Sequence, residues 1–435
     1  MFKIFLNAWR VQDIRRKLLF IFLLLLIYRF GNVIPLPGID LDALYWVRYG
    51  GGGGGPTNIF NMIAGGQLGT LFTMGIAPYI TASIIMQLLT YAIPKLSQMQ
   101  KEGEDGRKMI QQITRYMSVG LAALQAGAMV FSWTRMPLTI EGEVMVVNMF
   151  RYANVFTYLM AVVAMMTGTI FIMWLAELIG ERGIGNGASF LIFANILAQL
   201  PMGALMLLDM ALSGGVTGWI STIVMLIIFV FIIAFVVLVH EGERRIPVQN
   251  SKKAANGRTM YGSQSSYIPL KVNIAGVLSI IFAISLLHFP VQVSGFFPIS
   301  PAWMERFAML DPNSHWVGSI LYVILIFVFT HFYTSFAVNT VEMAENMKKS
   351  GGFIPGIRPG KPTSDFIQTS VNRLSWIGSV FYSLIALIPI AMQWITGVPL
   401  GFGGTTLLIV TGVALEFIKQ LESQLLMRHY KGFLD

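Results

Sequence analysis

The sequence predicts an all-α integral membrane protein with ten transmembrane helices in two five-helix halves. Two observations support this prediction. Hydrophobic residues make up 55% of the 435 residues and charged residues only 12%, whereas a soluble domain carries about 25% charged residues. The basic residues also lie almost entirely in alternate connections between the apolar segments. An ordinary soluble enzyme and a disordered chain are excluded, and the lack of cysteine excludes disulfides and thiolate metal sites.

Ten apolar windows have the length of about 20 residues that a helix needs to cross a bilayer. They lie at 18–36, 72–93, 116–135, 153–175, 189–208, 216–239, 274–291, 316–340, 374–396 and 402–421. Arg29 and Gly31 interrupt the first window. No small-residue cleavage site follows it, so we interpret it as a span and not as a signal peptide.

The basic residues predict the orientation, because lysine and arginine are enriched in cytoplasmic loops. Of the 30 basic residues, 25 lie on the side of the N-terminal segment and four on the other, while Arg29 lies within a span. Both termini are therefore expected in the cytoplasm. The spans divide at Ser213-Gly-Gly215 into residues 1–212 and 213–435. Each half has an odd number of spans, so the halves have opposite topology, which permits an inverted repeat.

Four regions between the spans are unusual. Region 37–71 contains six glycines, Gly50–Gly55, followed by an apolar segment that is too short to span and is expected to be re-entrant or capping. Region 94–115 has mixed charge and is expected to be a solvated loop. Regions 240–273 and 341–373 are long, basic and rich in proline and glycine, which favours docking of a cytoplasmic partner over a plain connection. Two stretches of 240–273 could form a hairpin.

The residues that could support catalysis do not gather into one site in the sequence. The five histidines are scattered without metal-binding spacing, and we expect neither a metal nor a cofactor. The glycines of 183–187 indicate a tight turn. A secondary transporter would need charges within its spans, and an intramembrane enzyme a paired nucleophile and base. Glu177 and Glu416 lie near cytoplasmic span ends and are more simply interfacial than a proton relay. A conduit driven by a cytoplasmic partner fits best.

The second span carries the most informative pattern, Gly75-Ile-Ala-Pro-Tyr-Ile-Thr-Ala-Ser-Ile-Ile-Met-Gln87. Ile76, Ile80 and Ile84 recur every four residues and form one stripe of a helix. Pro78 is expected to kink this helix. Small and polar side chains occupy the opposite face, which in membrane helices usually indicates packing against a neighbour.

Six segments together resemble the signature segments of the bacterial SecY family, over essentially the whole chain. They are the second-span motif, Glu181-Arg-Gly-Ile-Gly-Asn-Gly187, Gly242-Glu-Arg-Arg-Ile-Pro-Val-Gln249, 269–276, Pro355-Gly-Ile-Arg-Pro-Gly360 and 403–409. The resemblance implies two pseudo-symmetric halves that hinge around an hourglass pore. The glycine run before residue 57 departs from the family pattern. A scramblase, or an insertase of another fold, would not explain all six segments.

The resemblance also implies functional residues. The pore ring would be Ile76, Ile80, Ile84, Ile192, Ile281 and Ile409. The plug, at about 57–70, would include Asn58, Ile59, Phe60, Asn61, Met62 and Ile63. Gln87 and Gln125 would lie at the lateral gate between spans 2–3 and 7–8. Arg244, Arg245, Arg258 and Arg358 would dock partners.

The function implied is that of a channel, not an enzyme. It would pass unfolded secretory polypeptides across the bacterial cytoplasmic (inner) membrane and release transmembrane segments sideways into lipid. The partners implied are SecE, SecG, the SecA ATPase, the ribosome and precursors that carry signal sequences, with SecDF and YidC as further partners.

Overall fold

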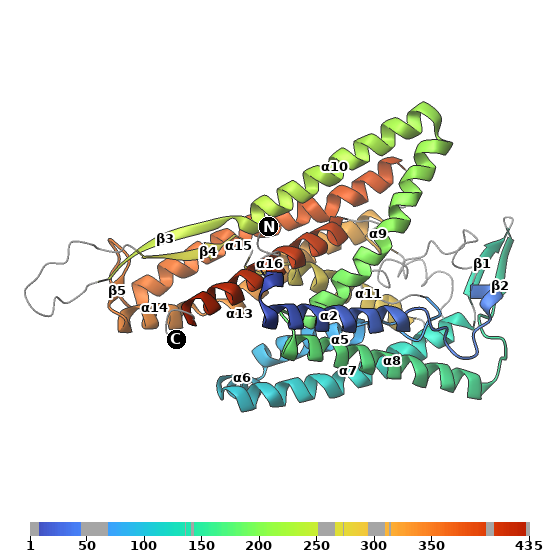
Figure 1. Ribbon diagram of the computed structural model, residues 1–435, viewed down its shortest axis with the longest axis horizontal. Coiled ribbons are helices and arrows are strands. Elements are labelled where there is room, and N and C mark those ends of the chain that lie inside the picture. Colours follow the sequence, from blue (N-terminus) through green and yellow to red (C-terminus); the bar gives the residue numbers. More distant parts are fainter. Residues whose placement is uncertain are drawn as a thin grey trace, which may run out of the picture.

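The protein is a bundle of long helices with small β-sheets at its two ends (Figure 1). The computed structural model describes residues 8–44, 68–134, 136–140, 143–250, 266–272, 274–294, 309–312, 315–396 and 404–431. The expected helical membrane-protein class is confirmed, because apolar helices dominate these residues.

A helix overlaps each of the ten apolar windows. The helices are α2 (Gln12–Gly31), α5 (Ala77–Ala92), α7 (Glu104–Trp133), α8 (Val155–Arg182), α9 (Gly187–Ser213), α10 (Gly215–Glu241), α11 (Leu278–Ser294), α13 (Trp316–Ala337), α15 (Lys361–Thr396) and α16 (Gly404–Lys431). Within the described residues, six helices are long and apolar enough to cross a membrane. A seventh span results if α5 and α6 (Pro94–Lys101), which meet at a 100° bend, are counted as one.

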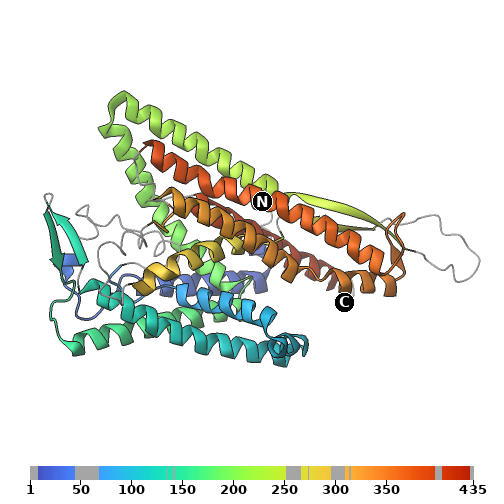
Figure 2. The same ribbon diagram turned by 180° about the vertical axis from the view of Figure 1, so that it is seen from behind.

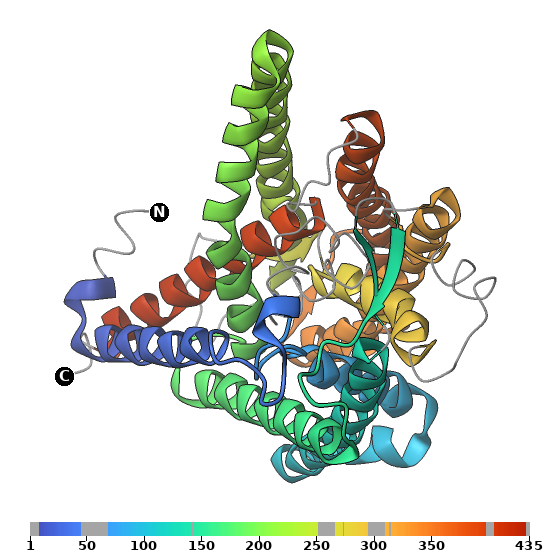
Figure 3. The same ribbon diagram turned by 90° about the vertical axis from the view of Figure 1, so that its right-hand side faces the viewer.

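The helices form two groups joined by central helices. Helices α2, α5, α7 and α8 lie together along one side of the molecule, and α10, α13, α15 and α16 lie along the other (Figures 1 and 2). Helix α11 packs against α5, α7 and α13, whereas α9 packs against α8, α10 and α16. The α9–α10 hairpin extends away from the remaining helices (Figure 3), and much of its exposed surface is apolar.

The turn before α9 allows a close approach of two helices. At Gly187, a Cβ atom would lie 1.8 Å from the carbonyl oxygen of Ala176 on α8. Gly185 has a positive φ of 90°, which glycine adopts at little cost. The predicted tight turn at 183–187 is confirmed, and its glycines let α9 begin directly against α8.

Two expectations about the second span and its following loop are wrong. Region 94–115 is not a solvated loop, because it contains α6 and the first turns of α7. Glu104 and Asp105 lie in the first turn of α7, where acidic side chains suit the helix dipole. Pro78 does not kink α5, because the helix begins at Ala77. A proline in the first turn needs no partner for its missing N–H.

The strands lie at opposite ends of the bundle (Figures 1 and 2). Strands β1 (Met136–Ile140) and β2 (Glu143–Val147) form one hairpin. At the other end, β3 (Glu243–Asn250) pairs antiparallel with β4 (Ser266–Lys271) and with β5 (Gly352–Phe353). The predicted hairpin within 240–273 is thus confirmed. The β1–β2 hairpin was not predicted, although its two runs flank a Glu-Gly turn signal.

Candidate pore and lateral gate

Six isoleucines from four helices belong to one hydrophobic cluster at the centre of the bundle. Ile76 caps the start of α5, Ile80 and Ile84 follow on that helix, and α9, α11 and α16 contribute Ile192, Ile281 and Ile409. Ile80 is half-buried, and the other five are at most 6% exposed. The cluster also contains many neighbouring apolar side chains.

The backbone around Ile76 explains its position. Gly75 has a φ of 54°, and residues 71–76 form a run of turns before α5 begins. The chain therefore reaches the centre of the bundle in a compact, non-helical segment. Ile76 is 1% exposed there, one turn before Ile80. A side chain buried in such an apolar cluster offers no hydrogen-bonding partner to water or to ions.

The two glutamines of the predicted gate lie on neighbouring helices but at different depths. Gln87 lies on α5, where its Nε2 donates to Ser83 Oγ at 3.4 Å and its Oε1 has no hydrogen-bond partner. Gln125 is buried on α7, and its Nε2 also has no partner. Gln87 faces Thr114 of α7 across a pocket, and Gln125 lies roughly 16 Å further along α7 than Thr114. The structure does not bring the two glutamines together.

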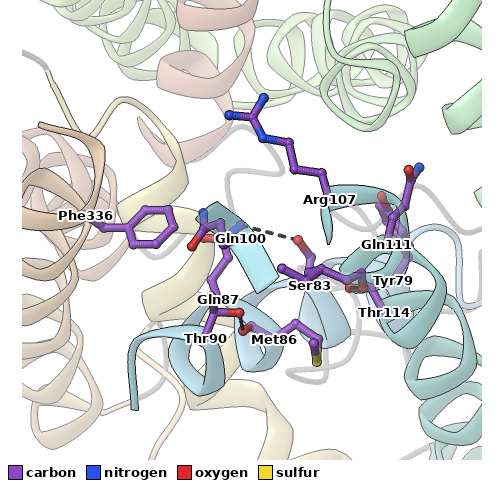
Figure 4. Close-up of a pocket in the computed structure, with 11 residues that line it drawn as sticks. Tyr79, Ser83, Met86, Gln87, Thr90, Gln100, Arg107, Gln111, Thr114 and Phe336 are labelled. Atoms are coloured by element: carbon purple, nitrogen blue, oxygen red, sulfur yellow. Dashed lines mark hydrogen bonds between the residues drawn. The ribbon is translucent and has the colours of Figure 1, made fainter. Parts of the chain in front are cut away.

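A pocket of about 210 Å³, lined largely by polar residues, lies between α5 and α7 beside the bend into α6. Its walls include Gln87 and Thr90 of α5, Gln100 of α6, and Arg107 and Gln111 of α7. Phe336 of α13 closes it from the opposite side (Figure 4). The pocket thus lies where the two groups of helices meet. No local pattern in the sequence indicates this pocket, because its walls come from four helices.

An ion pair ties α7 to α8 beside this pocket. Arg115 Nε donates to Glu177 Oε1 at 2.7 Å, and Gln111 Nε2 approaches the same oxygen at 3.4 Å. The side chain of Glu177 is only 10% exposed. The carboxylate of Glu177 thus links two neighbouring helices.

The predicted docking loops form one structural unit. Arg244 and Arg245 lie on β3, where Arg245 Nε donates to Glu243 Oε1 at 2.7 Å. This hydrogen bond from the guanidinium raises the pKa of Arg245. The guanidinium also lies 4.8 Å from the ring centre of Tyr267 on β4. Beneath the sheet, a separate apolar cluster joins both loops; it consists of Ile246, Val248, Leu270, Met347, Ile354, Ile367, Val371 and Leu374.

Arg358 is exposed in the turn between β5 and α15. Gly356 and Gly360, with φ of 80° and 105°, shape this turn. The buried Thr363 donates through Oγ1 to the carbonyl oxygen of Arg358 at 2.8 Å. The backbone is held while the guanidinium faces solvent.

Helix α14 (Thr340–Lys349) was missed by sequence analysis, although a signal for it exists. Asn339 accepts from the backbone N–H of Glu342 and donates to its side chain at 3.1 Å. This reciprocal cap is recognisable from the spacing of Asn and Glu. The helix supports the docking unit by packing on α15 and β5.

Two predicted elements lie outside the described residues. They are the plug residues Asn58, Ile59, Phe60, Asn61, Met62 and Ile63, and the docking residue Arg258. Of the predicted plug segment at about 57–70, residues 68–70 are described, and the carbonyl of Gly69 accepts from the N–H of Leu36 at 3.0 Å. Within the described residues, no group of three or more histidine, aspartate or glutamate side chains could hold a metal ion.

Comparisons with known proteins find relatives of similar sequence and solved structures of similar fold. The SecY family model matches residues 70–418. The chain is 42% identical to protein translocase subunit SecY of Streptomyces galbus, with 99% of both chains covered. It is 40% identical to the same subunit of Halalkalibacterium halodurans, with 100% of both covered. A solved structure described as a protein conducting channel has a TM-score of 0.66 at 20% identity, covering 93% of this chain and 90% of that one.

Proposed function

Because the chain belongs to the SecY family and is therefore a subunit of a protein-conducting channel, we propose that its six clustered isoleucines form the constriction of the pore. One observation carries this proposal. The isoleucines come from α5 and α9 of residues 1–212 and from α11 and α16 of residues 213–435, and they belong to one cluster. A ring made by both halves widens when the halves separate.

The chemistry of the ring suits an unfolded polypeptide. Aliphatic side chains seal a narrow opening by excluding water. They change rotamer at little cost and offer no hydrogen bond that would retain a particular sequence. The channel therefore conducts polypeptides of many sequences, and the plug at about 57–70 supplements the seal on the outer side.

The proposed membrane topology rests on the basic residues and on the end of the bundle at which they lie. All ten helices span the bacterial cytoplasmic membrane in two pseudo-symmetric halves, and both termini lie in the cytoplasm. In support, the basic segments around β3–β4 and α14 lie at the end of the bundle opposite the β1–β2 hairpin (Figures 1 and 2). Positive residues favour the cytoplasmic side.

The seam between α5–α7 and α11–α13 serves as the lateral gate for signal sequences and transmembrane segments. Gln87 and Gln125 contribute polar groups at two depths of this seam. Replacing both glutamines by leucine will alter the stringency of signal-sequence selection; an unchanged stringency would remove them from the gate.

The cytoplasmic unit of β3, β4, β5 and α14 docks the motor or the ribosome. Arg244, Arg245, Arg258 and Arg358 supply its positive charge, which suits acidic protein surfaces and RNA phosphates. SecE and SecG are the membrane partners, and SecA hydrolyses the ATP, so this subunit itself is not an enzyme. Signal-bearing precursors are the substrates.

Crosslinking from the ring tests the function directly. The chain lacks cysteine, so Ile80→Cys introduces a single reactive thiol. In vesicles with SecE and SecA, a stalled precursor with single cysteines will form disulfides to this residue. The crosslinks will require ATP and a signal sequence and will move with the stall point. Ile227→Cys, on the exposed apolar face of α10, is the matched control. Transport without crosslinks at residue 80 would refute the pore assignment.

A further inference from the structure

We propose that Tyr91 and Phe332 form an aromatic latch at the cytoplasmic end of the lateral seam, and that its strength sets how readily the channel accepts a weak signal sequence. The two rings meet edge to face, with centroids 5.5 Å apart and an interplanar angle of 78°. Tyr91 lies on α5 and Phe332 on α13. The inference rests on the proposed function, because it assigns residues that determine the specificity of the same gate.

The position of the pair makes it a latch. Tyr91 is the second-last residue of α5, and α5 bends by 100° into α6 directly after it. Tyrosine at this level of a membrane helix keeps its hydroxyl near water while its ring stays in the apolar region. Tyr91 is 70% exposed, so its contact with Phe332 is not supported by surrounding side chains. The contact can therefore break without disturbing the core.

The polar pocket weakens the same part of the seam. Phe336 lies one turn beyond Phe332 on α13 and faces Gln87 and the other polar walls across the pocket (Figure 4). Space and polar side chains replace close packing there, and Gln87 Oε1 has no hydrogen-bond partner. The main packing partners of α13 are α11 and α15 rather than α5. At this end, the aromatic pair therefore carries a large share of the contact between α5 and α13.

The size of the effect follows from the type of contact. An edge-to-face aromatic pair stabilises a contact beyond the apolar packing of its two rings. This extra stabilisation corresponds to roughly a two- to tenfold change in the equilibrium between the closed and the open seam. Loss of the latch will shift the seam toward the open state by that factor. A strong signal sequence opens the seam in either case, so the change will appear mainly with weak signal sequences.

Two substitutions test the latch. Tyr91→Leu and Phe332→Leu will each raise the transport of a precursor with a defective signal roughly two- to tenfold, relative to the intact precursor. The double variant will show no larger effect than either single variant, because both remove the same contact. Tyr91→Phe keeps the ring and will behave like the unsubstituted chain. Tyr116→Leu on α7 removes an equally exposed aromatic ring outside the pair and is the matched control.

A disulfide tests the same contact without relying on stability. In the cysteine-free chain, Tyr91→Cys with Phe332→Cys will crosslink on oxidation, stop lateral release of a transmembrane segment and recover on reduction. Either single variant will be insensitive to oxidation. Normal release by the oxidised pair, or unchanged selection in the leucine variants, would overturn the latch. Failure of the unsubstituted chain to transport an intact precursor would instead overturn the proposed function.

Discussion

The apolar cluster of the proposed ring and the end of the bundle that carries β3 and β4 (the β3–β4 end) are held together by different forces. In the cluster, five of the six isoleucines of the proposed ring are almost fully buried. At the β3–β4 end, an ion pair joins α7 to α8, an aromatic pair joins α5 to α13, and a cation lies over Tyr267 in the β-sheet. Packing at the centre is non-directional, whereas the contacts at the end have specific partners.

This difference separates sealing from selection. A seal must re-form after a polypeptide of any sequence has passed. Aliphatic side chains suit this task, because they can exchange one apolar neighbour for another. Selection must respond to a particular signal or partner, so it gains from contacts that one event can break. Substitutions at the centre should therefore affect ion leakage, and substitutions at the end should affect recognition or local stability.

A charge in the ring should produce the largest effect. Ile281 is 6% exposed on α11, and Ile281→Asp places a carboxylate within the apolar cluster. Because a buried charge recruits water, we expect ion conductance of the resting channel to rise at least about tenfold. Single-channel recording in planar bilayers measures it. Ile281→Leu keeps the apolar constriction and should stay closed; equal conductance of the two variants would contradict the seal.

A charge reversal at the docking end should reduce transport without causing leakage. Arg358 is exposed, and only its backbone carbonyl is held by Thr363. Arg358→Glu should lower SecA-driven transport about tenfold by weakening association with the motor. Thermal stability and resting conductance should not change. Thr363→Val is the informative comparison, because it removes the hydrogen bond that holds the turn but keeps the arginine. Full transport activity of Arg358→Glu would show that this arginine does not take part in docking.

Local sequence patterns indicate the isoleucine stripe of α5 but not the contacts at the β3–β4 end, and the reason is physical. Ile76, Ile80 and Ile84 are one helical turn apart, so periodicity alone places them on one stripe. The pocket and the Arg115–Glu177 pair depend on helices that are distant in the sequence, and no local pattern encodes their contact. Helix α14 is an intermediate case, because Asn339 and Glu342 form a recognisable cap within a segment whose overall composition resembles a loop.

The Arg115–Glu177 ion pair should contribute moderately to stability. Glu177→Gln removes the negative charge that pairs with Arg115, whose side chain is 40% exposed and can rehydrate. We therefore expect a loss of about 1–2 kcal/mol, below the cost of breaking a fully buried pair. Thermal unfolding in detergent measures it. Glu241→Gln is the matched control, because the Lys419–Glu241 pair is more exposed and should contribute less than about 1 kcal/mol. Equal losses would show that burial of Glu177 adds nothing.

The smallest expected effect concerns the cation over Tyr267. Tyr267→Leu keeps an apolar side chain on β4 but removes the ring beneath Arg245. The loss should be small because the site is exposed, and hydrogen exchange of the β3–β4 amides should detect it as local opening. Glu243 still accepts from Arg245 in this variant, so the arginine keeps one of its two partners. Tyr267→Phe should behave like the unsubstituted chain. A large drop in global stability would instead mean that the hairpin is part of the main core, although its apolar residues form a separate cluster.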